Sequence, residues 1–333
     1  MAQAALFDAE LPPTGGGVQP AATSAEVQAL AARLHQRWGG RLHLGTSSWH
    51  FPGWAGWVFA RAYPEARLSR EGLAAYAQHP LLNTVSLDRA FYRPLEAATY
   101  RALAAQVPSH FRFVVKAPAL LSDATERDPA TGAALRDNPH FLDAEAAVAL
   151  CARPAAEGLT DKLGVLVWQL SPLPRRWLDD ETSLLRRLGA LWAAVEAALP
   201  PDAQQALELR DPALLTPALA ATLKFHGVRP VLGLHDRMPA ADAQLPLLRA
   251  TWPGDLVCRW NLQRGQRYAE ARDAWAPFSR FQAEDLPTRQ TLVKVVIATL
   301  QAGRAAFITV NNKAEGCAPA SVLALAAALD TAA

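Results

Sequence analysis

The sequence is poor in the residues that build covalently or metal-stabilised folds. Its 333 residues include only three cysteines, and none of them forms a Cys-x-x-Cys pair. This usage excludes a disulfide framework and a cysteine-rich zinc module. The eight histidines are scattered along the chain, and because they lack metal-ligand spacing the sequence predicts no metal site.

The chain also lacks a marked charge excess and a membrane-spanning stretch. Its 33 basic and 31 acidic residues give a net charge of +2, which indicates no general affinity for nucleic acid or anionic membranes. No apolar run approaches the roughly 18 residues that span a bilayer. The start has no basic segment and carries Asp8 and Glu10 where a signal peptide would be apolar. We therefore expect a soluble, cytoplasmic protein with no membrane partner.

Several nucleotide and hydrolase motifs are missing. The chain contains no Gly-x-Gly-x-x-Gly, no Gly-x-x-x-x-Gly-Lys-Ser/Thr, no His-Glu-x-x-His and no Gly-x-Ser-x-Gly. These absences disfavour dinucleotide-binding, P-loop and simple zinc-hydrolase functions. Hydrophobic residues nevertheless make up 51% of the chain, which is ample for one large core.

The N-terminal residues divide into a tail and a helix. Residues 1–22 are rich in glycine, proline and alanine, and such a segment buries too little apolar surface to offset its ordering entropy, so a flexible tail is expected. Thr23 and Glu26 have capping-box spacing, and the apolar positions that follow predict a helix ending at Gly39-Gly40. We expect residues 23–333 to form one domain.

From Arg41 onward, short apolar runs alternate with helical patterns, one run about every 38 residues. Runs that are apolar on both faces are typical of parallel strands covered on both sides. The fold class predicted is α/β, a single (β/α)8 TIM-barrel-like domain; a doubly wound open sheet is the alternative. The polar stretch 121–140 is expected to be a long loop and a candidate lid. The eight predicted strands are 42–47, 83–87, 111–116, 164–170, 206–210, 230–235, 256–260 and 306–310.

In such a barrel the chemistry lies where the carboxyl ends of the strands converge, so residues at the strand exits are the candidate site. We predict Lys116 and Glu208 as catalytic residues. The predicted substrate-binding residues at these exits are Thr46, Trp49, Gln169, Arg210, Asp236, Arg259, Asn311 and Asn312.

The strongest candidates share strand faces. Glu208 and Arg210 have the same parity and so share a face; together they can orient a polar ligand or form a structural ion pair. Lys116 is predicted to face inward as an anion contact, although such a lysine can also donate a proton, form an imine or simply be solvated. His235 and Asp236 point to opposite faces unless the strand has already ended.

Two loops carry further candidates with two interpretations each. Trp49, Trp54 and Trp57 fall within nine residues and can stack on a sugar or a base, or pack the loop onto the barrel. The segment from Asn311 to Pro319 combines amides, a lysine and a helix start, which suggests an anion cradle. In the alternative interpretation, its asparagines satisfy backbone groups in a tight turn.

Taken in order, these residues resemble domain-of-unknown-function family number seventy-two, the YecE-like barrels. The resemblance rests on Gly45-Thr46-Ser47-Ser48-Trp49, Phe91-Tyr92-Arg93-Pro94, Phe111 to Lys116, Leu166 to Pro172, Glu208-Leu209-Arg210, Asp236, Arg259 with Tyr268, and Asn311, Asn312, Gly316 and Ala318. It implies a TIM-barrel-like fold, adds Tyr268 to the candidate substrate-binding residues and implies no settled activity.

The chain departs from the family pattern at three places. Val85-Ser86-Leu87-Asp88 stands where the family usually carries Val-Glu-Ile-Asn, which removes a candidate acid–base carboxylate at Ser86. Asn261-Leu262 replaces the usual His-Gly, and Ser48 replaces a glycine. If the family chemistry needs that Glu and that His, it is altered or lost here.

Two functional hypotheses follow from the sequence. The first is an enzyme, a hydrolase, lyase or isomerase, acting on a small anionic, sugar-like or phosphorylated substrate at the barrel mouth, with Glu208 as general acid or base. The alternative is a non-catalytic protein that binds a metabolite or, less favoured, nucleic acid. The sequence specifies no cofactor and no oligomeric state.

Overall fold

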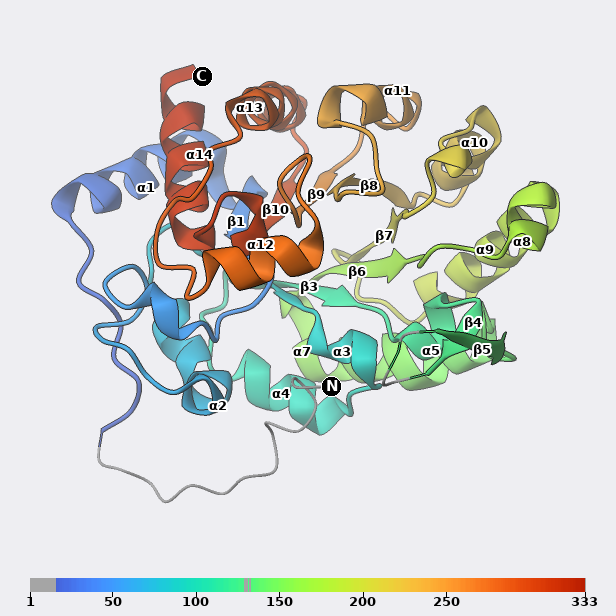
Figure 1. Cartoon of the computed structure of the whole chain (residues 1–333), viewed down its shortest axis with the longest axis horizontal. Helices are drawn as coiled ribbons and strands as arrows, with labels where there is room; N and C mark the ends of the chain where they lie inside the picture. The colour runs from blue at the N-terminus through green and yellow to red at the C-terminus, as the bar shows by residue number, and fades with distance from the viewer. Residues whose placement is uncertain (1–15, 129–130, 132, 333) are drawn as a thin grey trace.

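The eight predicted strands close into a parallel barrel in the computed structural model, which describes residues 16–128, 131 and 133–332. The strand order around the barrel is β1-β10-β9-β8-β7-β6-β3-β2 (Figure 1). The TIM-barrel prediction is therefore confirmed, and the open-sheet alternative is wrong. The barrel strands are β1 (Leu42–Thr46), β2 (Thr84–Leu87), β3 (Arg112–Lys116), β6 (Leu163–Gln169), β7 (Gln204–Glu208), β8 (Arg229–Leu234), β9 (Leu256–Trp260) and β10 (Ala306–Val310).

Helices follow every barrel strand and form the outer layer (Figure 1). Short 3-10 turns and one π turn join them, and the π turn Val148–Ala152 continues α6 directly into α7. The helices are α1 (Ala25–Trp38), α2 (Glu65–Tyr76), α3 (Arg89–Tyr92), α4 (Ala97–Ala104), α5 (Ala119–Ser122), α6 (Ala144–Ala147), α7 (Arg153–Leu159), α8 (Arg175–Asp179), α9 (Glu181–Glu196), α10 (Pro217–Phe225), α11 (Ala241–Ala250), α12 (Tyr268–Trp275), α13 (Leu286–Gln301) and α14 (Ala318–Ala332).

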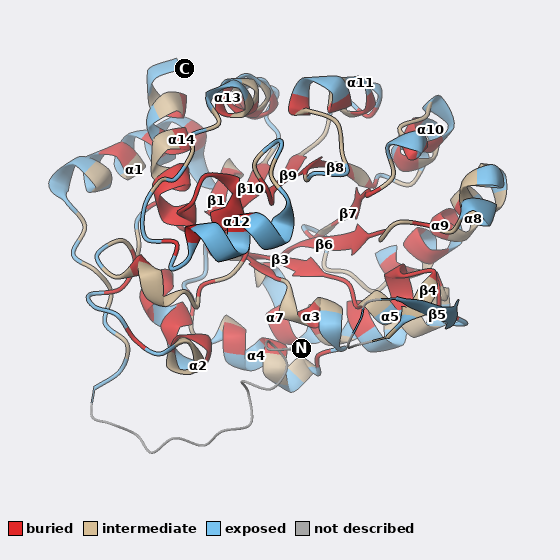
Figure 2. Ribbon diagram, in the orientation of Figure 1, coloured by how far each residue is buried: buried red, intermediate tan, exposed pale blue. Residues whose placement is uncertain are grey.

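Alternation along the strands separates two apolar layers. Side chains at every second strand position point outward and join the large core between the sheet and the helices, as those of Phe113 and Val115 do. Those at the other positions fill the barrel with a small cluster of mostly β-branched residues. Figure 2 shows the strands as a buried centre inside helices whose outer faces are exposed. The inner cluster is Val114, Val165, Val167, Ala206, Val231, Val257 and Phe307.

The same inward parity places polar residues directly above this apolar layer. Lys116 follows Val114 by two residues, Glu208 follows Ala206, and Arg259 follows Val257. All three are at least nine-tenths buried. The barrel therefore changes from apolar to charged along its axis, and the charged layer lies at the carboxyl ends of the strands, here called the barrel mouth.

The N-terminal region differs from the sequence prediction in two details. Ser24 caps α1 by accepting a hydrogen bond from the Val27 amide, in place of the predicted Thr23. Within the segment expected to be a tail, Gln19 and Ala21 make backbone hydrogen bonds with Ala60 and Val58. Residues 1–15 of that segment lie outside the described residues.

The stretch 121–140, expected to be a loop, contains regular structure in its described part. Strands β4 (Thr125–Arg127) and β5 (Ala134–Asp137) pair as an antiparallel hairpin. Arg136 pairs with Glu126 across it, and Arg176 of α8 reaches Asp137 at 2.7 Å. The hairpin thus lies next to α5 (Figure 1) and contacts α8 through this ion pair.

No helix in the part of the chain that the structure describes combines the length and the apolar character needed to cross a bilayer.

Gly45 provides a test of barrel packing. A Cβ atom at this position would lie 1.9 Å from the Thr84 carbonyl oxygen on the adjacent strand, so Gly45→Ala requires the backbone to move. We expect a loss of about 3 kcal/mol in unfolding free energy, measured by urea denaturation. Gly40→Ala is the matched control, because its Cβ would meet no atom within 4 Å; equal losses in both variants would contradict the packing argument.

Candidate functional site

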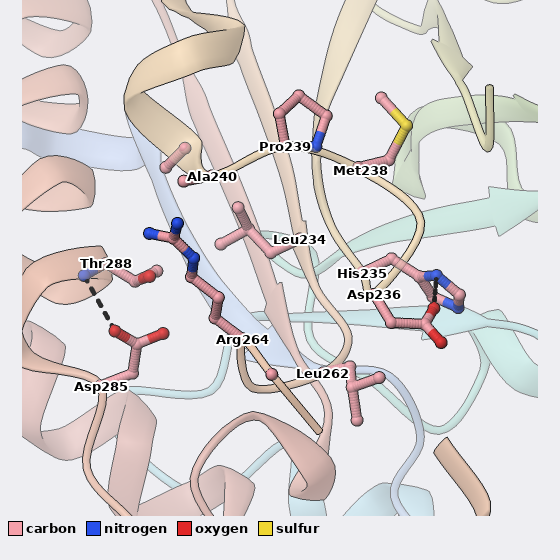
Figure 3. Close-up of a pocket in the computed structure, with 12 residues that line it drawn as sticks. Leu234, His235, Asp236, Met238, Pro239, Ala240, Leu262, Arg264, Asp285 and Thr288 are labelled. Carbon is pink, nitrogen blue, oxygen red and sulfur yellow. Dashed lines mark hydrogen bonds and ion pairs between the residues drawn. The ribbon is translucent and has the colours of Figure 1, made fainter. Parts of the chain in front are cut away.

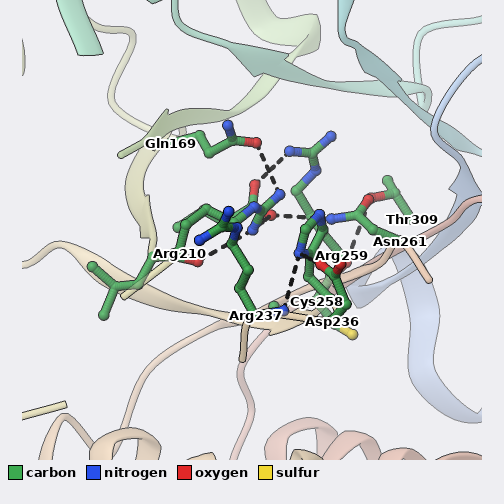
Figure 4. Close-up of polar contacts among 12 residues, drawn as sticks. Gln169, Arg210, Asp236, Arg237, Cys258, Arg259, Asn261 and Thr309 are labelled. Atoms are coloured by element: carbon green, nitrogen blue, oxygen red, sulfur yellow. Dashed lines mark hydrogen bonds and ion pairs between the residues drawn. The ribbon is translucent and has the colours of Figure 1, made fainter. Parts of the chain in front are cut away.

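A fully buried carboxylate organises the barrel mouth. Glu208 Oε1 accepts hydrogen bonds from Arg210 Nη1 at 2.6 Å and Asn261 Nδ2 at 3.0 Å, and Oε2 accepts one from Arg259 Nη1 at 2.5 Å. Figure 4 shows Arg210, just after β7, lying close to Arg259 and Asn261 at the end of β9. Gly233, on the inward face of β8, leaves room beside this carboxylate, since a Cβ there would approach Glu208 Cγ at 3.6 Å.

The network continues in two directions from the arginines. Arg259 Nη2 donates to Asp88 Oδ1 at 2.6 Å, and Ser86 Oγ donates to the same oxygen at 2.6 Å. On the other side, Arg210 Nη2 donates to Gln169 Oε1 at 2.9 Å. Side chains from β2, β6, β7 and β9 and the residues just beyond them are thereby linked across the barrel.

The electrostatics of the network keep Glu208 ionised. Burial alone would raise the pKa of Glu208, but Arg210, Arg259 and Lys116 outweigh it and lower the pKa to about 2. A general acid or base works best with a pKa near the working pH. Glu208 therefore fits the role of a fixed counter-ion that positions the two arginines.

Lys116 has a different environment from the arginines. Its side chain is buried, its Nζ lies 3.4 Å from the centroid of the Phe91 ring, and it makes no ion pair with any described residue. Burial lowers the pKa of Lys116 to about 8, with Asp88 opposing the shift and Arg259 adding to it. This amine is thus a cation at neutral pH that can also exchange a proton.

The solvent side of the network carries two aromatic residues. Tyr92 is 70% exposed and Tyr268 is 47% exposed, and Asp88 raises the pKa of both phenols in addition to the effect of their partial burial. The pKa of Tyr268 rises to about 12. The predicted residue Tyr268 thus lies within electrostatic range of Asp88 at the mouth.

His235 and Asp236 lie beyond the end of β8, which stops at Leu234. The backbone has therefore left the strand, and His235 Nδ1 approaches Asp236 Oδ1 at 2.5 Å, a contact that alternation along a continued strand would not allow. Burial and Arg210 lower the pKa of His235 to about 4. The pair lines one side of a small cavity of about 60 Å³, with Arg264 and Asp285 on the other (Figure 3).

Four of the predicted residues hold the surrounding loops. Thr46 Oγ1 donates to the Ser48 carbonyl, and Trp49 Nε1 donates to the Leu68 carbonyl. Asn311 Nδ2 donates to Ser47 Oγ, while Asn312 Oδ1 accepts from Trp54 Nε1 and from the Ala318 amide. The geometry therefore matches the turn interpretation for Asn312, because its side chain caps α14 in place of an anion.

Asp88, Ser86 and Asn261 belong to the network although sequence reasoning did not select them. Ser86 and Asn261 are two of the departures from the family pattern, and each donates directly to a carboxylate of the network. The carboxylate missing at position 86 is present two residues later as Asp88, just beyond the end of β2, where Ser86 Oγ donates to it. Asp88 and Asn261 both stand at strand exits, the position from which the site residues were predicted, although neither was among those residues.

Comparison with known proteins identifies the family. The family model described as "Protein of unknown function DUF72" matches residues 43–333. This chain belongs to the DUF72 family. No curated protein matches its sequence.

Solved structures of DUF72 proteins share the fold. A DUF72 family protein from Enterococcus faecalis is 18% identical, with a TM-score of 0.58 over 86% of this chain and 95% of that one. A DUF72 family protein from Thermotoga maritima is 15% identical, with a TM-score of 0.54 over 85% and 96% of the two chains. At these identities the likeness shows the fold alone.

The described parts of the chain contain no group of three or more His, Cys, Asp or Glu side chains arranged to hold a metal ion. Each carboxylate of the Glu208 network is instead engaged by arginine.

The buried network provides a stability test. Glu208→Gln removes the charge that faces Arg210 and Arg259, and leaving buried charges uncompensated should cost about 3–5 kcal/mol of unfolding free energy, measured by urea denaturation. As a control, Glu71→Gln removes the i,i+4 partner of Arg67 on an exposed helix face, where about 0.5 kcal/mol or less is expected. If Glu208→Gln had the same unfolding free energy as wild type, the network would not contribute to the stability of the fold.

Proposed function

We propose that this DUF72 protein is an enzyme whose barrel mouth binds a small anionic molecule, such as a carboxylate or phosphate ester. The observation that carries the proposal is the charge balance of the site. Lys116, Arg210 and Arg259 supply three buried cations, whereas Glu208 and Asp88 supply two carboxylates, both paired with arginine. An anion bound at Lys116 would give this ammonium a counter-ion, since a buried cation without a partner is costly.

In this proposal Lys116 is the catalytic residue. Its Nζ would contact the anionic group and, with a pKa of about 8, would hold or deliver a proton near neutral pH. Arg210 and Arg259 would contribute fixed positive charge, because arginine stays protonated. Glu208 would act as a positioning residue, and Gln169 would orient Arg210 through the 2.9 Å hydrogen bond. These roles suit a proton-transfer step in a hydrolase, lyase or isomerase.

The alternative of nucleic-acid binding through tryptophan stacking has less support. Trp49 and Trp54 are buried, and Trp57 Nε1 donates to the Ser279 carbonyl. Their rings pack and anchor the loop after β1, which leaves the cationic mouth as the best supported binding surface.

The first test is binding of sulfate and inorganic phosphate by isothermal titration calorimetry. Lys116→Met should weaken both at least tenfold, because a charge-assisted contact contributes about 1.5–3 kcal/mol. Lys224→Met is the matched control, since Lys224 is exposed near the end of α10. Absence of anion binding to the wild type, or equal binding by both variants, would reject the proposed site.

The pH dependence of binding separates the lysine from the arginines. The ammonium form of Lys116 binds the anion, and its pKa in the folded protein is about 8. Sulfate affinity should therefore be steady below pH 7 and fall as the pH rises through about 8. Lys116→Arg should bind sulfate without this fall, because a guanidinium does not titrate in that range. An unchanged pH profile in Lys116→Arg would assign binding to other groups.

A further inference from the structure

A second lysine at the mouth is buried without a counter-ion. Lys313 lies in the 3-10 turn Asn312–Ala314 just after β10 and is 4% exposed. Its Nζ donates to Asn311 Oδ1 at 3.3 Å and makes no ion pair with any residue that the structure describes. The rings of Tyr268 and Phe278 flank the ammonium, with centroids at 4.3 and 5.4 Å.

The surroundings of Lys313 match those of Lys116. Burial lowers the pKa of Lys313 to about 8, Arg272 adds to the shift, and Asp88 opposes it. Asp88 has the same effect on Lys116, so both ammonium groups are within electrostatic range of one carboxylate. That carboxylate is already bound to Arg259 at 2.6 Å and compensates neither lysine fully.

The two lysines come from separated parts of the barrel. Lys116 ends β3 and Lys313 follows β10, and strands β1 and β2 stand between these two in the barrel order. With Arg210 and Arg259 the mouth holds four buried cations; Glu208 and Asp88 pair with the two arginines, and the buried Asp123, which lies near Arg127, is also in electrostatic range of Lys116. Lys116 and Lys313 are the two of these cations that make no ion pair with a described residue, and because they follow strands that β1 and β2 separate, a ligand that pairs with both needs an anionic group for each.

We propose that the ligand of this mouth carries two anionic groups, one bound by Lys116 and the other by Lys313. This inference rests on the proposed function and narrows it to a small dianion whose charges lie at opposite ends, a dicarboxylate or a molecule with two phosphoryl groups. Tyr268, which begins α12 and is 47% exposed, covers Lys313 on the solvent side. Rotation of this half-exposed ring would admit the second group.

The test compares probes with one and two charged ends by isothermal titration calorimetry. The probes are linear α,ω-dicarboxylates from malonate to adipate and α,ω-bisphosphonates from methylene to butylene, each beside its single-ended counterpart, butyrate or methylphosphonate. One chain length in at least one series should bind wild type at least tenfold more tightly than its single-ended counterpart. Lys313→Met should remove that advantage and leave the single-ended probe unaffected, whereas Lys116→Met should weaken both.

Control variants keep the outcomes distinct. Lys313→Arg retains the positive charge and should keep a preference for the two-ended probe, and Lys224→Met should behave as wild type. If Lys313→Met binds the two-ended probes as tightly as wild type does, the second anionic group is not bound at Lys313. If Lys116→Met still weakens binding of the single-ended probes in that case, the proposed anion site at Lys116 is retained. If neither lysine variant alters any binding, both proposals fail. Thermal unfolding of each variant confirms that the protein compared is folded.

Discussion

The structure of the barrel mouth depends on the ionised carboxylate of Glu208. It is fully buried, and the desolvation free energy of such a charge is offset only where opposite charges surround it. Arg210 and Arg259 meet this requirement directly, and each then reaches onward, to Gln169 and to Asp88. One buried charge thereby fixes the positions of side chains that come from strands far apart in the sequence.

The same arrangement makes the lysines distinct from the arginines. The two guanidinium groups are held by carboxylates, whereas Lys116 and Lys313 contact aromatic rings and make no ion pair among the described residues. The site thus divides its cations into a pair held by carboxylates and a pair that makes no ion pair with a described residue, and in the proposed function the second pair binds the ligand. This division is the physical basis of the proposed anion chemistry.

The departures from the family pattern have a different meaning in three dimensions. By sequence, Ser86 and Asn261 are losses of a carboxylate and an imidazole. In the structure both are hydrogen-bond donors to the remaining carboxylates, Ser86 to Asp88 and Asn261 to Glu208. Asp88 supplies a carboxylate two residues beyond the missing one. In this chain the two carboxylates of the network, Glu208 and Asp88, thus each accept a hydrogen bond from a residue that departs from the family pattern.

Residue patterns alone predicted a parallel sheet covered by helices on both faces, because alternating apolar runs and helices at a regular interval have few other ways to bury both faces. The interval favoured a barrel over an open sheet, and the closure of the strands decided between them. They also selected Lys116, Gln169, Glu208, Arg210 and Arg259, because strand parity and strand ends follow from local sequence. Which of these residues touch was decided only by the closed barrel, which brings Asp88 after β2 and Glu208 on β7 within reach of Arg259 on β9. Only the tertiary structure shows that Trp49 packs its loop against α2, through a hydrogen bond to the Leu68 carbonyl. It likewise shows that Asn312 caps α14 at the Ala318 amide, because both partners lie in other elements.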